Sequence, residues 1–200
     1  METKYSADQK IILLLFKDLS TTHTITSIAK YCGLSRVGTW KIVKKLASKE
    51  YLIEKKIGSG QRNVSVIKLN WQNILLEKLL SFFLTQEAVK QRRWRINFSL
   101  LEPQTRFILL YGSILYTPQK AKDIDIINVT KKNTFIEMQK SIDTIQKTET
   151  KKIHAINFTS SEFEQELRKP NEAILDAIKK GVVLFGQDRF IKWMKKIQTK

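Results

Sequence analysis

Cysteine, proline and glycine are scarce in this chain, which has one, three and seven of them among 200 residues. The single cysteine, Cys32, cannot form an internal disulfide and lacks neighbours at the spacing of a zinc site. So few prolines and glycines, with 42% hydrophobic residues, exclude a largely disordered chain. The longest apolar run, 11–16, is far shorter than the roughly 20 residues that cross a bilayer, and no signal sequence precedes it. We therefore expect a soluble, cytoplasmic protein without a membrane partner.

Acidic residues are also few: 19 Asp and Glu stand against 36 Lys and Arg, which gives a net charge of +17. The excess is larger in residues 1–100, which hold 18 basic and 7 acidic side chains. A positive field of this size attracts phosphate groups on nucleic acid, on nucleotides or on an anionic membrane. The alternative is a lysine-rich, solvated surface, so the basic residues need a structural context.

The first third of the chain predicts three helices followed by a hairpin. Apolar residues recur at helical spacing in the first and third helices, and Thr26 and Ser35 are the expected N-caps of the second and third. Two β-prone runs follow, joined by Gly58-Ser59-Gly60, which is a hairpin signal. The predicted elements are helices 7–19, 27–31 and 36–49 and strands 51–57 and 63–69.

This order of elements resembles a winged helix-turn-helix DNA-binding domain of the MarR type. The resemblance rests on the run 28–35, on a third helix that ends in Lys44-Lys45-Leu46, and on the strand start 51–53. One departure is Glu50, because the family usually has a glycine there to end the recognition helix in a left-handed turn. The resemblance implies a regulator that binds double-stranded DNA.

The third helix is expected to enter the major groove with one face and to pack on the core with the other. If Thr39, Val43 and Leu46 face the core, a basic and partly aromatic set of residues is exposed. The residues expected to contact DNA are Ser35, Arg36, Val37, Trp40, Lys41 and Lys44, with Lys55, Lys56 and Arg62 around the hairpin. The alternative is that these helices dock a protein partner.

Residues 71–104 predict a helical connector, because no glycine or proline interrupts the chain between Gly60 and Pro103. Thr85 is expected to start a second helix within this segment. Winged-helix regulators commonly dimerise through such helices, which places two recognition helices over two half-sites. A homodimer and a helix that packs only on its own two domains are both open at this stage.

The second half of the chain contains a paired-carboxylate motif between two predicted strands. The apolar strand 107–111 ends at Gly112-Ser113, and nine residues later Asp123-Ile124-Asp125 leads into the strand 126–129. Residues two apart on a strand point the same way, so Asp123 and Asp125 present two carboxylates on one face. Divalent cations such as Mg²⁺ relieve the repulsion between such carboxylates and hold nucleotide phosphates. The alternative is a pair of loop carboxylates that form ion pairs with Lys120 or Lys122.

The same pattern, with the later run 181–186, resembles the minimal nucleotidyltransferase fold of the polymerase-β type. The resemblance implies that Asp123 and Asp125 are catalytic and bind Mg²⁺, and that Gly112 and Ser113 bind a nucleoside triphosphate. The run 114–118 departs from the family because it lacks the usual arginine, for which Lys120 or Lys122 is a substitute. A third carboxylate is also missing from the expected strand 153–158, where His154 or Asn157 takes its place.

The sequence therefore predicts a two-domain α+β protein, with domains 1–70 and 105–200, the second an α/β domain with a mixed sheet, joined by 71–104. We expect a DNA-binding transcriptional regulator whose second domain binds a nucleotide with Mg²⁺ and has lost part of its catalytic apparatus. One alternative is an active nucleotidyltransferase that transfers a nucleoside monophosphate to a hydroxyl on a protein, a nucleic acid or a small molecule. Another is a component of a toxin–antitoxin pair.

Overall fold

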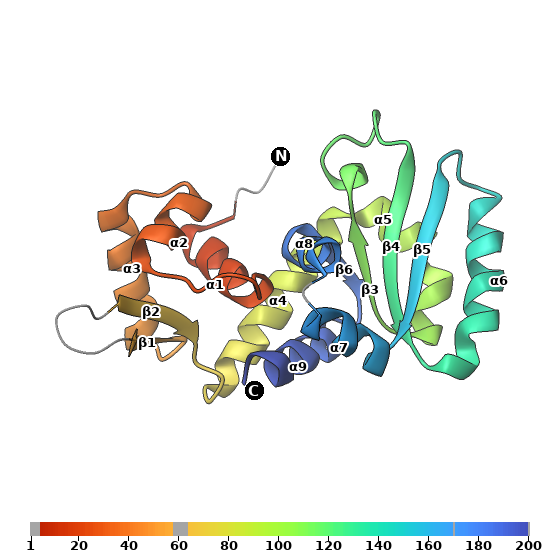
Figure 1. Cartoon of the computed structure of the whole chain (residues 1–200). Helices are drawn as coiled ribbons and strands as arrows, with labels where there is room; N and C mark the ends of the chain where they lie inside the picture. The colour runs from red at the N-terminus through yellow and green to blue at the C-terminus, as the bar shows by residue number, and fades with distance from the viewer. Residues whose placement is uncertain (1–4, 58–63, 170, 200) are drawn as a thin grey trace. The chain divides into compact units, whose positions relative to one another are not determined.

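The computed structural model describes residues 5–57, 64–169 and 171–199 and has an α+β fold (Figure 1). It contains a two-stranded sheet and a mixed four-stranded sheet. The chain divides into two compact units, one made of residues 1–83 with 195–200 and the other of residues 84–194. Within the described ranges, no helix is both long and apolar enough to cross a membrane.

The first unit begins with three helices and a hairpin, in the predicted order. The helices are α1 Ala7–Lys17, α2 Ile25–Cys32 and α3 Arg36–Ser48, and the strands are β1 Leu52–Ile57 and β2 Val64–Leu69. The strands are antiparallel and pair Leu52 with Leu69. Buried apolar residues of the helices and of both strands form its core, among them Ile11, Phe16, Ile28, Val43, Leu46, Leu52 and Val66. The expected turn 58–60 lies outside the described residues.

The start of α2 differs from the prediction. Thr24, and not Thr26, is the N-cap: its side chain accepts a hydrogen bond from the Ser27 N–H, and the Ser27 hydroxyl accepts one from the Thr24 N–H. This reciprocal pair satisfies two N–H groups that a helix leaves open. Thr26 is instead inside the first turn, so α2 is longer than predicted.

The C-termini of α2 and α3 are closed by the same pattern of hydrogen bonds. After α2, the N–H groups of Gly33 and Leu34 donate to the carbonyls of Lys30 and Ala29. After α3, Glu50 occupies the place of Gly33 in this pattern. Their φ angles are 65° and 58°, and Glu50 is the one non-glycine residue with positive φ in the described part of the chain. The departure from glycine noted in the sequence therefore leaves the left-handed turn in place.

The segment 71–104 is helical, but it does not break where predicted. Helix α4 runs from Ile74 to Lys90 through Thr85, and α5 Arg92–Asn97 and a 3₁₀ helix η2 Ser99–Gln104 follow. No glycine or proline interrupts α4, and a single exposed threonine, Thr85, costs too little helix propensity to end it. The segment is divided between the two units, whose boundary falls after Phe83.

The last six residues belong to the first unit, not to the same unit as the sheet that precedes them. The indole N–H of Trp71 donates to the Gln198 side chain over 3.1 Å, and the Lys195 ammonium is 2.6 Å from the Glu77 carboxylate. The Gln198 amide also donates to the carbonyls of Leu15 and Phe16. These contacts explain why a C-terminal segment joins an N-terminal unit.

The second unit is built on four strands in the order β5-β4-β3-β6 (Figure 1). The strands are β3 Thr105–Tyr111, β4 Asp123–Thr130, β5 Lys152–Thr159 and β6 Val182–Phe185. The β4 and β5 strands are parallel and are connected through α6 Phe135–Gln146, whereas the other pairs are antiparallel. The register sets Asp125 opposite Tyr111 on one side and opposite His154 on the other.

Helices pack on both faces of this sheet, and β3, β4 and β6 are mostly buried. Side chains from α5, η2 and α6 pack with Ile124 and Ile126 on one face. The other face packs on aromatic residues of α7 Ser160–Arg168 and α9 Gln187–Gln198, and α8 Glu172–Lys180 contacts β3. Alternation along β4 and β5 places Asp123, Asp125 and His154 on this second face. The N-cap of α7 is Thr159.

Candidate functional site

Asp123, Asp125 and His154 form a cluster of potential metal ligands at one end of the four-stranded sheet. One ligand atom from each residue lies within 4.8 Å of the others. The Nδ1 atom of His154 is 3.4 Å from Asp123 Oδ2 and 3.5 Å from Asp125 Oδ1. The side chains are 33%, 23% and 45% exposed, so a cation can reach them from solvent. In the described part of the chain, this is the one group of at least three such residues.

Gly112 has no side chain, and the Asp125 carboxylate occupies the space that a side chain would fill. A Cβ atom at this position would lie 2.4 Å from Asp125 Oδ2. The φ of 82° and ψ of −168° of Gly112 also belong to a conformation that essentially only glycine adopts. The backbone at the end of β3 therefore lies close to the Asp125 carboxylate.

The electrostatics of the cluster favour binding of a positive charge. Burial raises the pKa of Asp125, the negative charge of Asp123 raises it further, and His154 opposes both effects. Burial and the same two carboxylates raise the pKa of Tyr111, which lies opposite Asp125 on β3. A divalent cation would relieve this repulsion between like charges.

Of the two candidates for the missing third carboxylate position, the register selects His154. Asn157 is three residues further along β5 and so faces the other side of the sheet, where it accepts a hydrogen bond from Asn128 over 3.0 Å. The sequence analysis left both residues open, and the pairing of β5 with β4 shows that His154 lies opposite Asp125. An alternating pattern read from the buried Ile153 would have favoured His154.

Ser113, the second residue of the motif, does not begin an α-helix. Ser113 begins one 3₁₀ turn, Ser113–Leu115, and its carbonyl accepts hydrogen bonds from the N–H groups of Tyr116 and Thr117. So short a turn lacks the dipole that lets an α-helix bind anions. The exposed Lys120 and Lys122, the expected substitutes for arginine, are in the loop between this turn and β4.

In the first unit, α3 presents the side chains that the sequence assigned to DNA. Thr39, Val43 and Leu46 are buried as predicted. The exposed set comprises Arg36, Val37, Trp40, Lys41 and Lys44, of which Val37 is 66% and Trp40 50% exposed. Ser35 caps the helix by accepting a hydrogen bond from the Gly38 N–H over 3.0 Å. A Cβ at Gly38 would lie 2.9 Å from that hydroxyl, so this glycine accommodates the cap.

The hairpin brings further charge to the same unit. Lys55 and Lys56 are exposed on β1, and Arg62 lies outside the described residues. Lys44 is 3.2 Å from the Glu54 carboxylate. Hydrogen bonds from Ser65 and Lys44 lower the pKa of Glu54, which therefore opposes part of the positive charge beside α3.

No protein-family model, no curated protein and no solved structure matches the chain.

Proposed function

We propose that the protein binds double-stranded DNA through α3 and acts as a transcriptional regulator. The observation that carries this proposal is the exposed face of α3, where Arg36 and Lys41 flank the exposed Trp40. No acidic residue occurs between Ser35 and Lys49. A helix with an exposed basic face fits the major groove, while Lys55 and Lys56 on the adjacent hairpin are available to phosphates.

The test is the salt dependence of DNA binding by the Arg36→Ala/Lys41→Ala variant. Loss of two contacts should weaken binding by about tenfold or more and reduce the slope of log K against log salt by up to about 2. The matched control is Lys140→Ala/Lys147→Ala, which removes two exposed lysines from the α6 region of the second unit. Equal binding by both double variants would remove α3 from the DNA interface.

We propose further that the protein forms a homodimer through α4. Leu75 and Phe82 are seven residues apart on this helix, within the first unit, and are 62% and 56% exposed. Residues seven apart lie on the same face of a helix, where a second helix can pack. In sedimentation, Phe82→Glu should convert a dimer to a monomer, whereas Lys140→Glu, which changes an exposed lysine of α6, should leave the dimer intact. A monomeric wild-type protein would overturn this part of the proposal.

A second function, binding of a nucleotide with a divalent cation, is favoured by the cluster of Asp123, Asp125 and His154. The two carboxylates offer the oxygen ligands that Mg²⁺ and Mn²⁺ prefer, and the imidazole favours Mn²⁺ over Mg²⁺. When bound, such a cation would hold the phosphates of a nucleotide. Because Gly112 has no side chain, the Asp125 carboxylate can lie directly beside its backbone.

Thermal unfolding with each nucleoside triphosphate and with Mg²⁺ or Mn²⁺ tests this second function. A ligand at 100 times its dissociation constant should add roughly 2.7 kcal/mol to the free energy of unfolding. The Asp123→Asn/Asp125→Asn variant should lose this gain, whereas Asp143→Asn, an exposed residue of α6, should retain it. Transfer of an α-labelled phosphate to an acceptor would show an active nucleotidyltransferase, and binding without transfer would show a sensor. A gain that survives in the double variant would disprove the site.

A further inference from the structure

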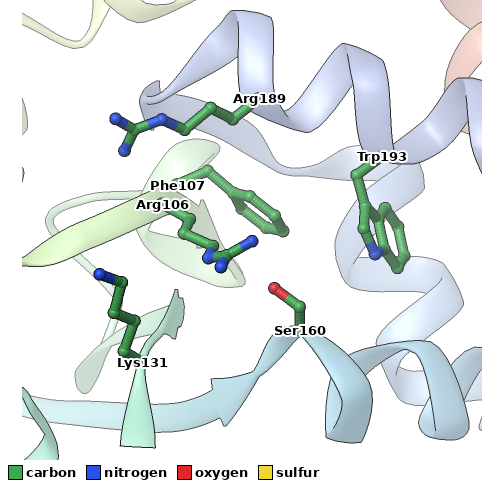
Figure 2. A pocket seen from close by; sticks show the side chains of 6 residues that line it. All are labelled: Arg106, Phe107, Lys131, Ser160, Arg189 and Trp193. Atoms are coloured by element: carbon green, nitrogen blue, oxygen red, sulfur yellow. The ribbon is translucent and has the colours of Figure 1, made fainter. Parts of the chain in front are cut away.

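A pocket of about 380 Å³ is present in the second unit, where β4 and β5 end. The six residues that line it are Arg106, Phe107, Lys131, Ser160, Arg189 and Trp193. They come from β3, from the position after β4, from the first turn of α7 and from α9. Figure 2 shows the cationic side chains on one side, Trp193 on the other, and Phe107 and Ser160 between them. None of the lining residues is acidic.

The three cations are brought together without a compensating carboxylate. Within the described residues, none of Arg106, Lys131 and Arg189 forms an ion pair. Arg189 is held in place by a hydrogen bond of 3.0 Å from its Nη1 to the Thr105 carbonyl. Arg106 and Lys131 are exposed. Like charges that converge on a pocket repel one another until an anion binds between them.

Ser160 adds neutral donors that an anion can use. It is the first residue of α7, a helix of nine residues, and its own N–H has no partner within the helix. The cap residue Thr159 bonds to the N–H and the carboxylate of Glu162, so this part of the helix start is already satisfied. The helix dipole adds to the attraction for negative charge at Ser160.

The opposite wall is aromatic. Phe107 is buried, with ring contacts to Phe163, Phe190 and Trp193 at 5.6, 5.1 and 6.2 Å between centroids. The indole nitrogen of Trp193 is buried and has no hydrogen-bond partner in the described part of the chain. Figure 2 shows this nitrogen on the edge of the ring turned toward Ser160. A planar, apolar ring can pack on this aromatic wall.

We propose that this pocket binds a small phosphate ester that carries a planar ring, of the chemical class of a nucleoside monophosphate. Arg106, Lys131 and Arg189 bind the phosphate together with Ser160, and Phe107 and Trp193 contact the ring. Three cations suit a dianion, and the volume is in the range of small-molecule sites.

The pocket is separate from the carboxylate cluster, and the proposal does not depend on it. Asp125 and Lys131 lie six residues apart along β4 and just beyond it, so about 20 Å separates them at about 3.3 Å per residue. The two regions also have opposite charge. A ligand that binds at Lys131 without metal therefore does so independently of Asp125.

The experiment is calorimetric titration of the full-length protein with AMP in EDTA, which removes divalent cations from the carboxylate cluster. We expect binding that Arg106→Gln/Lys131→Gln weakens by at least tenfold. Lys132→Gln, which changes the neighbouring exposed lysine outside the pocket, should bind like the wild type. Asp125→Asn should also bind like the wild type, which separates this result from the fate of the proposed metal site.

Two further probes divide the pocket into its halves. Adenosine and inorganic phosphate should each bind more weakly than AMP, because each reaches one wall only. Phosphate that binds as tightly as AMP would overturn the assignment of the aromatic wall. Equal binding of AMP by the wild type and the double variant, or no binding by the wild type, would overturn the site itself. Circular dichroism of the double variant should match the wild type, since both side chains are exposed and unpaired.

Discussion

The two candidate sites of this protein are assembled in different ways. In the first unit, the exposed residues of α3 lie within nine positions of one helix, from Arg36 to Lys44. In the second unit, Gly112 follows the end of β3, whereas Asp125 and His154 lie near the starts of β4 and β5. An α-helix has 3.6 residues per turn, so residues close together in the sequence can lie on one exposed face of α3. Along a strand only every second residue faces the same side, so the carboxylate cluster combines residues from neighbouring strands.

This comparison indicates how each site should respond to mutation. The face of α3 has few internal contacts, so substitutions there should change binding and leave stability nearly unchanged. The carboxylate cluster depends on the close approach of Gly112 and on the pairing of β4 with β3 and β5. Substitutions there should change stability and metal binding together.

The largest effect is expected for Gly112→Ala. The new Cβ would lie 2.4 Å from Asp125 Oδ2, and alanine is strained at a φ of 82°. We expect a loss of about 1–3 kcal/mol in the free energy of unfolding and loss of metal-dependent stabilisation. Chemical denaturation with and without Mn²⁺ measures both. DNA binding should persist in this variant; an unchanged response to Mn²⁺ would show that Gly112 does not position the carboxylate.

Glu50→Gly should have a smaller effect of opposite sign. Glu50 has a φ of 58°, and its carbonyl accepts hydrogen bonds from the side chains of Asn70 and Asn73. Glycine relieves the strain of the left-handed turn but gains freedom in the unfolded chain, so we expect about 0.5–1 kcal/mol of stabilisation. Thermal unfolding measures this. Glu50→Gln, which removes the charge alone, should give no comparable gain.

Glu54→Gln should strengthen DNA binding slightly. The Glu54 carboxylate is 3.2 Å from the Lys44 ammonium, so its removal frees Lys44 for a phosphate. We expect about a two- to fivefold gain in affinity, the size of an exposed ion pair, which fades at high salt. The same change in a Lys44→Gln background should give less. An equal gain in both backgrounds would show that Lys44 does not contact DNA.

The smallest effect is the pH dependence of Asp125→Asn. Because burial and Asp123 raise the pKa of Asp125 in the folded state, protonation favours folding. That contribution is present below the ordinary pKa of 3.8 and is lost as pH rises through the folded value. Without metal, Asp125→Asn should therefore be more stable than the wild type at pH 7, and the difference should shrink on acidification. Saturating Mn²⁺ should stabilise the wild type alone; a difference independent of pH would contradict the proposed repulsion.

Much of the fold could be predicted from local pattern. The caps and apolar spacing of α3 and the strands around Asp123 were predicted within one to three residues because they depend on neighbours in sequence. Errors occurred where two local signals competed. Thr24 and Thr26 are both good caps, and Ser27 decides between them through its reciprocal hydrogen bond. Thr85 resembles a cap, but nothing before it ends α4.

The pocket beside Ser160 could not be predicted from the sequence. Arg106, Lys131 and Arg189 are far apart in the chain, and each by itself is an ordinary surface cation. The run Thr159-Ser160-Ser161 between a strand and a helix indicates a helix N-cap. Nothing in that run indicates a binding pocket. Only the meeting of α7, α9 and the end of β4 places the cations together.

The sequence by itself determined the exposed face of α3 and the common orientation of Asp123 and Asp125, because helix and strand periods fix which residues share a face. The tertiary structure decided that His154 completes the acidic cluster, since strand register depends on pairing between distant segments. It also decided that residues 195–200 join the first unit, through contacts of Gln198 with Trp71 and α1. Periodicity is a local property of the chain, whereas register and docking are set by burial of surfaces that come together only on folding.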